Sequence, residues 1–339
     1  ALAGASLLTF MSSGASFSAP YFFGGDFPML SVVIYNARSD FNDELALTLT
    51  VVLAGVSLLG VLLFRTRQQS TSRASKGTPA PVRSRSGRAA AAVLGWSVAL
   101  LLLIPHLNIL GMSLADHRAW HTELFPTHFT FENYVRLFQS PRALTPVWNS
   151  LWMSAAAAAL VLAAAVPLGY LIGRRRPWGR ALNGLVMIPW ALPGTVIAIN
   201  LIVAFNDPWL PLYNTVWMLP LAYFVRSIPI LTRVAAAAIE PFDASLLEAA
   251  QTLGASRWRC LWSIAVPLLA PAMAAGLALV FATCLGEFVA SILLYLPANL
   301  PISVKINMEW RTSVGVAFAY STLLMLLVAG AFALSRRFT

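Results

Sequence analysis

The sequence predicts an all-α, polytopic membrane protein, and three observations support that prediction. Hydrophobic residues make up 58% of the 339-residue chain and charged residues only 11%. A soluble domain carries about 25% charged residues, so this chain lacks the polar side chains that a soluble surface needs. The mean hydropathy is +0.73. Finally, apolar runs of about 20 residues recur along the chain, and that is the length a helix needs to cross a bilayer.

These apolar runs predict eight transmembrane helices, each separated from the next by a polar or basic segment. The expected helices are at residues 1–23, 44–64, 90–112, 146–172, 182–204, 214–234, 266–295 and 313–335. The first run lacks the basic region and the cleavage site of a signal peptide. We therefore expect the chain to start inside a longer protein.

Basic residues gather at the ends of the apolar runs, which is the positive-inside pattern of membrane proteins. The net charge of +10 is therefore attributed to membrane topology, and no nucleic-acid partner is expected. Placing every basic cluster in the cytoplasm gives a topology that alternates without conflict. The clusters are at residues 65–88, 174–180, 257–259 and 336–337. Arg226 and Arg233, near the inner end of their helix, are most simply anchors of the same kind.

Residues 65–89 form a Ser-, Arg- and Pro-rich segment between two parts of the chain. The segment has no apolar period, which predicts a flexible cytoplasmic linker. An internal repeat crosses it at an offset of 272 residues. This offset pairs Gly14 with Gly286, Ser31 with Ser303 and Ile34 with Ile306. Residues 1–64 are therefore expected to hold the last two helices of an N-terminally truncated first half, and residues 90–339 a complete second half of six helices.

One polar segment, EAAQTLGASRWRCLWSIAVPLL from Glu248, interrupts the apolar sequence. Ser245 and Glu248 have the spacing of a capping box, which predicts a short helix from Ser245 to Leu253. Gly254 can adopt the left-handed conformation that ends a helix, and Ser256 is a suitable N-cap for a second one. A surface helix that carries small residues and ends at a fixed hinge is typical of a docking element.

This segment resembles the EAA loop of binding-protein-dependent ABC importer permeases. The matching positions are Glu248, Ala249, Ala250, Gly254, Ile264 and Pro267, and Arg257 lies among them. The loop, about residues 240–264, forms in that family the coupling helix that sits in a cleft of the ATPase. Residues 129–134, FTFENY, resemble the FTLxNY stretch of the family, and PWALPG at 189–194 resembles its third-helix motif.

The resemblance implies the type I ABC importer transmembrane fold in a bacterial cytoplasmic (inner) membrane. It implies a cytoplasmic ATPase dimer that binds ATP and Mg, and a periplasmic or lipid-anchored substrate-binding protein. The chain itself would bind no cofactor and would be no enzyme. GEFVASILLY and PISVKI look most like the ferric iron branch, with thiamine, polyamines and phosphonates as alternative substrates. An ion-coupled secondary transporter is the alternative class, although the acidic residues of a proton relay are missing from the third helix.

Three residues are candidates for the translocation path. Glu287 lies within the predicted helix 266–295, and an acid in a membrane helix is costly and therefore a functional candidate. It could line the path, pair with an Arg of the missing half, or lie near the outer surface. Pro189 and Pro193 are candidates for kinking a helix that lines the path, with irregular packing as the alternative.

No catalytic or metal site is predicted. The chain has no GxxxxGK[ST] loop, and its two lysines are Lys76 and Lys305, so ATP must bind to another subunit. Cys260 and Cys284 have neither metal-ligand nor CxxC spacing. Four histidines surround one outer loop without the spacing of a ligand set: His106, His117, His121 and His128.

Overall fold

The computed structural model describes residues 16–25, 27–68, 84–116, 128–139, 141–173, 178–240 and 245–337. In these ranges the elements are helices, apart from one isolated bridge between Ala115 and Phe129. The chain is therefore an all-α protein. Most of the predicted first helix, and residues 69–83 of the predicted linker, lie outside the described residues.

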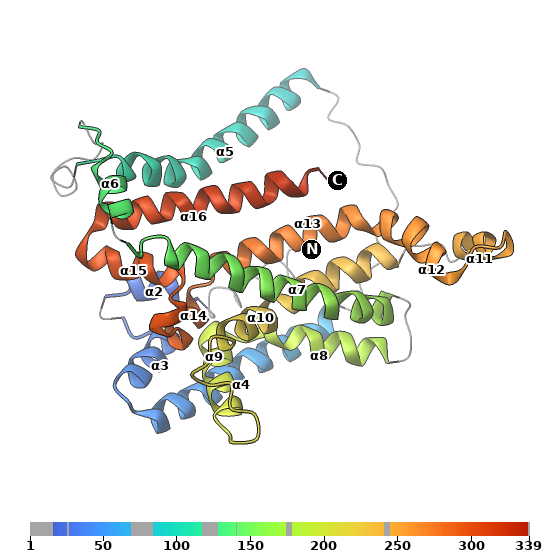
Figure 1. Cartoon of the computed structure of the whole chain (residues 1–339), viewed down its shortest axis with the longest axis horizontal. Helices are drawn as coiled ribbons and strands as arrows, with labels where there is room; N and C mark the ends of the chain where they lie inside the picture. Colours follow the sequence, from blue (N-terminus) through green and yellow to red (C-terminus); the bar gives the residue numbers. More distant parts are fainter. Residues whose placement is uncertain are drawn as a thin grey trace. The chain divides into compact units, whose positions relative to one another are not determined.

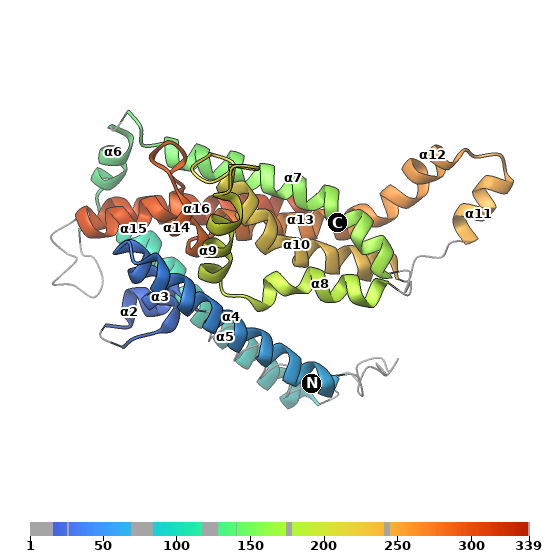
Figure 2. The same cartoon turned by 90° about the horizontal axis from the view of Figure 1, so that it is seen from below.

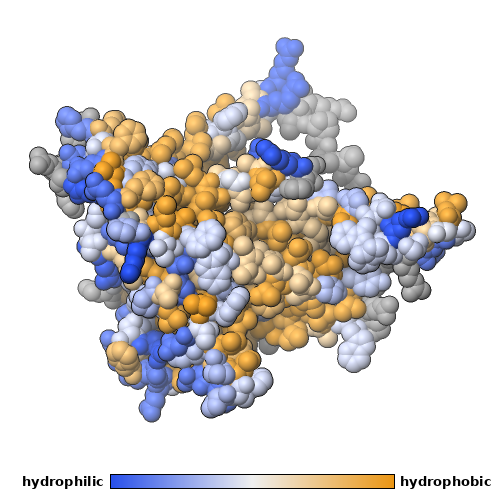
Figure 3. Space-filling model, viewed as in Figure 1, coloured by the Kyte–Doolittle hydropathy of each residue, from blue (hydrophilic) through white to orange (hydrophobic). Residues whose placement is uncertain are grey.

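Six of the described helices are long and apolar enough to cross a membrane. They match the predicted runs within a few residues at most ends, which confirms a polytopic membrane protein. These helices are α4 (Asp43–Gln68), α5 (Arg85–Ser113), α7 (Thr145–Gly173), α10 (Met218–Ile239), α13 (Val266–Leu285) and α16 (Val314–Ser335). In Figure 3 apolar side chains cover the central part of α7 and α13, as expected for surfaces that face lipid or other apolar helices.

The predicted helix 182–204 is not a single straight span. Two helices, α8 (Gly179–Ala191) and α9 (Gly194–Phe205), meet there at an angle of 107°. Pro193 causes the break, because a proline forces the residue before it out of the helical region. Leu192 accordingly has an extended backbone, with ψ of 137°. Pro189 lies inside α8 and does not interrupt it.

The predicted helix 266–295 is also too long. Helix α13 ends at Leu285, Gly286 follows as its C-cap, and a short helix α14 spans Val289–Leu294. A run of apolar residues hides such a break, because hydropathy is high on both sides of it. The break places Glu287 between two helices rather than within one.

The described chain forms two compact units. In the first (residues 1–64, 145–304 and 326–339), α7, α10 and α13 pack together and supply much of the buried core; Figures 1 and 2 show these helices side by side. Gly169 and Gly173 permit the close approach of α7 to α10. A Cβ at Gly169 would lie 2.4 Å from Ala235 Cβ, and one at Gly173 would lie 2.9 Å from the Ala236 carbonyl oxygen.

The second unit (residues 65–144 and 305–325) contains α5 and α6 (Glu132–Gln139). Here the FTFENY motif has a structural role. The buried Asn133 side chain donates to the carbonyl oxygens of Ser113 and Ala115, at 3.0 and 2.9 Å. The Tyr134 hydroxyl bonds Ser113 Oγ at 2.8 Å. The motif therefore satisfies carbonyl groups at the end of α5 that no helical N–H can reach.

The structure repeats one order of elements at the offset found in the sequence. Helices α2 (Ser18–Phe23), α3 (Leu30–Ser39) and α4 correspond to α14, α15 (Ile302–Thr312) and α16. Each set consists of a short helix, a second short helix and a long apolar one. The serines related by this offset make similar bonds, with acceptors that are one residue out of step. Ser31 Oγ donates to the Ser16 carbonyl at 2.9 Å, and Ser303 Oγ donates to the Glu287 carbonyl at 2.8 Å. The assignment of these sets to two permease halves remains a prediction.

Candidate functional site

The segment that resembles the EAA loop folds into two short helices joined at a glycine. Helix α11 spans Ser245–Thr252, and Gly254 follows with φ of +87°. The Gly254 N–H bonds the Gln251 carbonyl at 2.9 Å, and the Ala255 N–H bonds the Ala250 carbonyl at 3.0 Å. This pair of bonds is the Schellman motif, which requires a left-handed residue at the glycine position. The predicted role of Gly254 as the end of the helix is confirmed.

The second helix begins where the sequence predicted it. Helix α12 spans Arg257–Cys260, and Ser256 Oγ accepts a bond from the Arg259 N–H at 3.3 Å. One π-helical turn, Leu261–Ala265, then leads into α13. Ile264 lies in this turn and Pro267 in the first turn of α13, where a missing N–H costs nothing. The capping box at Ser245 remains a prediction.

This segment, residues 245–262, is largely exposed. Leu253 is 89% exposed, and Trp258 and Trp262 are 69% and 54% exposed. The two tryptophan rings pack edge to face, 5.5 Å apart. Glu248 and Ala249 are also exposed. Figures 1 and 2 show α11 and α12 extending away from the ends of α7 and α10. Exposed apolar side chains gathered on one segment mark an interaction surface.

A second site lies at the break between α13 and α14, where Glu287 forms an ion pair. Glu287 Oε2 is 2.9 Å from Arg226 Nε of α10, and Oε1 accepts a bond from the Ala290 N–H at 2.9 Å. The Glu287 side chain is 11% exposed and that of Arg226 is 29% exposed. Charges at this depth persist only when paired, because desolvation is costly. Both carboxylate oxygens of Glu287 are thus engaged within the chain.

Hydroxyl groups extend this site through the break. The Glu287 carbonyl oxygen accepts bonds from Ser291 Oγ at 2.6 Å and from Ser303 Oγ at 2.8 Å. Ser291 Oγ in turn bonds the Tyr223 hydroxyl of α10 at 2.7 Å, and both side chains are buried. The network satisfies a carbonyl group that the helix break leaves without its usual partner. It also ties α14 and α15 to α10.

The break between α8 and α9 lies against the same ion pair. Gly194 is the first residue of α9, and a Cβ there would lie 1.9 Å from Arg226 Nη1 and 2.9 Å from Val289 of α14. A larger residue would displace the guanidinium from this position and crowd Val289, so the close approach of Arg226 explains the last residue of the PWALPG motif. Nη1 itself is buried and has no hydrogen-bond partner in the described part of the chain.

The structure therefore brings some of the predicted path residues together. Glu287 and Pro193 lie at two helix breaks that meet through Arg226, while Pro189 lies inside α8. The expectation that Arg226 is an inner anchor is wrong, because α10 continues to Ile239 and leaves Arg226 well inside the helix. An available signal was an arginine and an acid within two apolar runs, since such charges usually pair. Among the described residues no three Asp, Glu, His or Cys side chains gather as metal ligands.

Comparisons with known proteins identify the family of this chain. Residues 165–339 match the family described as the binding-protein-dependent transport system inner membrane component. The chain belongs to that family. The matched region includes both the exposed segment and the Glu287 site.

Three relatives show how far the similarity extends. The probable ABC transporter permease protein y4fN of Sinorhizobium fredii is 30% identical over 88% of this chain and 55% of its own. The ferric transport system permease protein FbpB of Actinobacillus pleuropneumoniae is 28% identical over 97% of this chain and 49% of its own. A molybdate/tungstate transport system permease protein, WtpB of Thermococcus kodakarensis, is 31% identical over 51% of this chain and 70% of its own. The chain thus spans about half the length of the first two relatives.

A solved structure confirms the fold. A bacterial ABC transporter involved in the import of the acidic polysaccharide alginate superposes with a TM-score of 0.59 at 21% identity. The superposition covers 76% of this chain and 99% of the other. The type I fold predicted from the sequence is therefore supported by both sequence and structure.

Proposed function

We propose that this chain is part of the permease subunit of an ATP-driven importer. The observation that carries the proposal is the exposed segment 245–262, in which a Schellman turn at Gly254 fixes the angle between two short helices. Its small and apolar side chains point to solvent, where a cytoplasmic ATPase dimer would cover them. ATP and Mg would bind to that partner.

The helix that leaves this segment connects it to the Glu287 site. From α12 the backbone runs through one π turn into α13, whose 20 residues end one residue before Gly286. Twenty helical residues extend about 30 Å, which is the thickness of the bilayer core. A displacement of α11 would therefore be carried to the ion pair between Glu287 and Arg226. We assign Glu287 the role of holding this joint, since both its carboxylate oxygens are engaged.

We propose the bacterial cytoplasmic membrane as the location, with a periplasmic or lipid-anchored binding protein on the outer side. Closure of the ATPase dimer on ATP would move the coupling segment and open the path outward. Hydrolysis would then reset it. Rigid-body motion of this kind needs firm joints, and the two capped helix ends of the segment provide them.

We propose ferric iron as the substrate. The ferric relative matches 97% of this chain, whereas the molybdate/tungstate relative matches 51%. At 97% coverage the match to the ferric relative extends over both sides of the predicted linker, which supports a shared organisation. Thiamine, polyamines, phosphonates and oxyanions are the substrates to test if iron is not transported.

Gly254→Asp tests the docking role. Nothing lies within 4 Å of a Cβ at Gly254, and Asn and Asp adopt a left-handed backbone more readily than most residues. Any side chain strains a backbone with φ of +87°, and Gly254→Asn carries the same strain without the charge, so the difference in transport between the two variants reports the partner surface. We expect Gly254→Asp to abolish transport with membrane insertion unchanged. Gly254→Asn adds no charge and should retain more of the wild-type transport rate. Normal transport by Gly254→Asp would refute the docking role.

Uptake of labelled ferric iron tests the substrate. The full-length gene would be expressed with its ATPase and binding protein in a host lacking its own iron importer. An ATPase-dead variant is the control. Uptake that depends on the ATPase would support both the importer class and iron. An assembled, ATPase-active complex without iron uptake would retain the importer class and eliminate iron. Uptake that persists with the dead ATPase would favour an ion-coupled transporter.

A further inference from the structure

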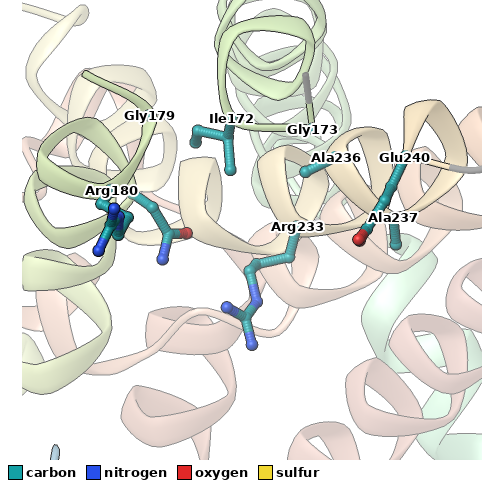
Figure 4. A pocket seen from close by; sticks show the side chains of 9 residues that line it. Ile172, Gly173, Gly179, Arg180, Arg233, Ala236, Ala237 and Glu240 are labelled. Carbon is teal, nitrogen blue, oxygen red and sulfur yellow. The ribbon is translucent and has the colours of Figure 1, made fainter. Parts of the chain in front are cut away.

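A cavity of about 710 Å³, lined by both polar and apolar groups, lies between the ends of α7, α8 and α10. It is separate from the exposed segment and from the Glu287 site. Figure 4 shows Arg180 and Arg233 reaching toward it from α8 and α10, with Ile172 of α7 beside them. The residues that line it are Ile172, Gly173, Gly179, Arg180, Asn183, Arg233, Ala236, Ala237 and Glu240.

Glycine packing explains why a cavity forms at this end. Gly169 and Gly173 hold α7 against α10, as described above, and α7 ends at Gly173. Helix α8 begins at the buried Gly179, where a Cβ would lie 3.0 Å from the Leu171 carbonyl oxygen. The backbones of α7 and α8 are therefore close, whereas the longer side chains of α8 and α10 are left facing an open space. The cavity is therefore a consequence of how these helix ends pack.

The charges in the cavity favour an anion. Arg180 and Arg233 form no ion pair or hydrogen bond within the described part of the chain. Both side chains are exposed to the cavity and to solvent, and Asn183 adds an amide group. Glu240 is the acid of the lining, and it already takes part in an interaction within the chain. Two guanidinium groups thus face a space that holds one carboxylate.

We propose that this cavity binds the phosphate headgroup of an anionic phospholipid. Guanidinium forks bind phosphate oxygens in pairs, and basic pockets between membrane helices on the cytoplasmic side suit anionic headgroups. The site lies where two apolar helices end, which is the depth of lipid headgroups rather than of acyl chains. Its volume falls within the range of small-ligand sites. Arg180 and Arg233 hold the phosphate, and the site is independent of the substrate that is transported.

Lipid titration of the full-length protein, purified with its associated subunits and delipidated, tests this proposal. Native mass spectrometry would count bound phosphatidylglycerol, with phosphatidylcholine and inorganic phosphate as separate probes. Arg180→Gln and Arg233→Gln are each expected to weaken phosphatidylglycerol binding about fivefold, since one basic residue contributes about that factor. Arg88→Gln is the matched control, because Arg88 is an exposed arginine near the start of α5 that does not line the cavity.

A variant that keeps the charges separates the cavity from surface electrostatics. Ala237→Phe fills the space, and we expect it to reduce phosphatidylglycerol binding while leaving membrane insertion unchanged. Equal binding by the wild type and all four variants would overturn the proposal. Inorganic phosphate that binds as tightly as phosphatidylglycerol, with the same sensitivity to Arg180 and Arg233, would retain the phosphate site and reject the lipid as its source. Equal losses in Arg88→Gln would show surface attraction only, and would also overturn it.

Discussion

Residues 16–68 and 287–335 contain two copies of one order of helices, and the copies share a serine bond but differ in charge. In both, a buried serine in the first turn of the second short helix donates to a carbonyl oxygen before the first short helix. In the second copy that carbonyl belongs to Glu287, whose side chain pairs with Arg226. In the first copy the carbonyl belongs to Ser16, and the offset of 272 residues pairs Glu287 with Ala15, so neither alignment gives the first copy an acid at this position.

In the first copy, aromatic rings gather around the start of α2. Phe17 stacks on Tyr21 at 5.1 Å and meets Tyr35 edge to face at 5.6 Å. Phe288 of the second copy joins this cluster, 6.1 Å from Phe17. Burial raises the pKa of the Tyr35 hydroxyl above its ordinary value, with a bond to Tyr21 acting in the same direction, so Tyr35 stays neutral at physiological pH. The serine bond is therefore a property of the arrangement, whereas the ion pair belongs to one copy.

The largest expected effect on stability is at the ion pair between Arg226 and Glu287. This pair is present only in the second copy, so its loss should destabilise that copy. Arg226→Met leaves Glu287 without its partner at a depth where a lone carboxylate is costly. We expect a loss of about 3 kcal/mol in stability, toward the lower end for buried pairs because Arg226 is partly exposed. Thermal unfolding in lipid nanodiscs measures the loss, and transport should fall with it.

A double variant separates the charge from the shape of the side chains. In Arg226→Met with Glu287→Gln no charge remains unpaired, and the Gln oxygen still accepts from the Ala290 N–H. We expect more than half of the lost stability to return. If the double variant is as unstable as the sum of the two single variants, the pair contributes no coupling and the contrast between the copies is wrong.

Phe17→Ala should have the next largest effect on stability, and it tests the aromatic cluster of the first copy. Phe17 is 1% exposed and contacts rings on three sides. We expect a loss of about 2 kcal/mol, below the usual cost of truncating a buried phenylalanine because the half-buried Tyr21 can close part of the cavity. Phe17→Leu should recover most of it. A change below about 0.5 kcal/mol in nanodisc unfolding would show that the cluster does not hold the two copies together.

The features that the sequence predicted well depend on neighbours within one helical turn. Gly254 and Ser256 end and begin helices through their own backbone and side chain, so their roles were apparent without tertiary information. The repeat was apparent because the same residue types recur at a fixed spacing in the sequence, and the helices that they form recur at that spacing too. The family resemblance also rests on such local positions, and the comparison with relatives confirmed the family.

The features that were missed depend on residues far apart in the sequence. Gly194 is 32 positions from Arg226, and Arg226 is 61 positions from Glu287. Hydropathy does not separate the two sides of the breaks at Pro193 and Gly286, because lipid and protein core are both apolar. Periodicity is weak for the same reason, and so the faces of α7, α10 and α13 were not predicted. Arg226 could be identified as the partner of Glu287 only from the fold.

The smallest effect belongs to the feature that the two copies share. Ser31→Ala and Ser303→Ala each remove one buried hydroxyl and leave a carbonyl oxygen short of a donor. Hydrogen bonds in membrane proteins contribute about 0.6 kcal/mol on average, so we expect losses of about 0.5–1 kcal/mol in each variant. The Glu287 carbonyl also accepts from Ser291, which predicts that Ser303→Ala costs less than Ser31→Ala.

The control for this pair is Ser57→Ala in α4. Ser57 Oγ donates to the Leu53 carbonyl one turn back, and that carbonyl lies within a continuous helix and keeps its backbone partner when the hydroxyl is lost. The loss of stability in Ser57→Ala should therefore be zero within experimental error. If Ser57→Ala costs as much as Ser31→Ala, the serine bond is no more than an ordinary helical hydroxyl. A cost confined to Ser31 and Ser303 would instead mean that both copies depend on the same bond for the angle between their short helices. The charge of Glu287 would then have been added to a joint that is stable without it.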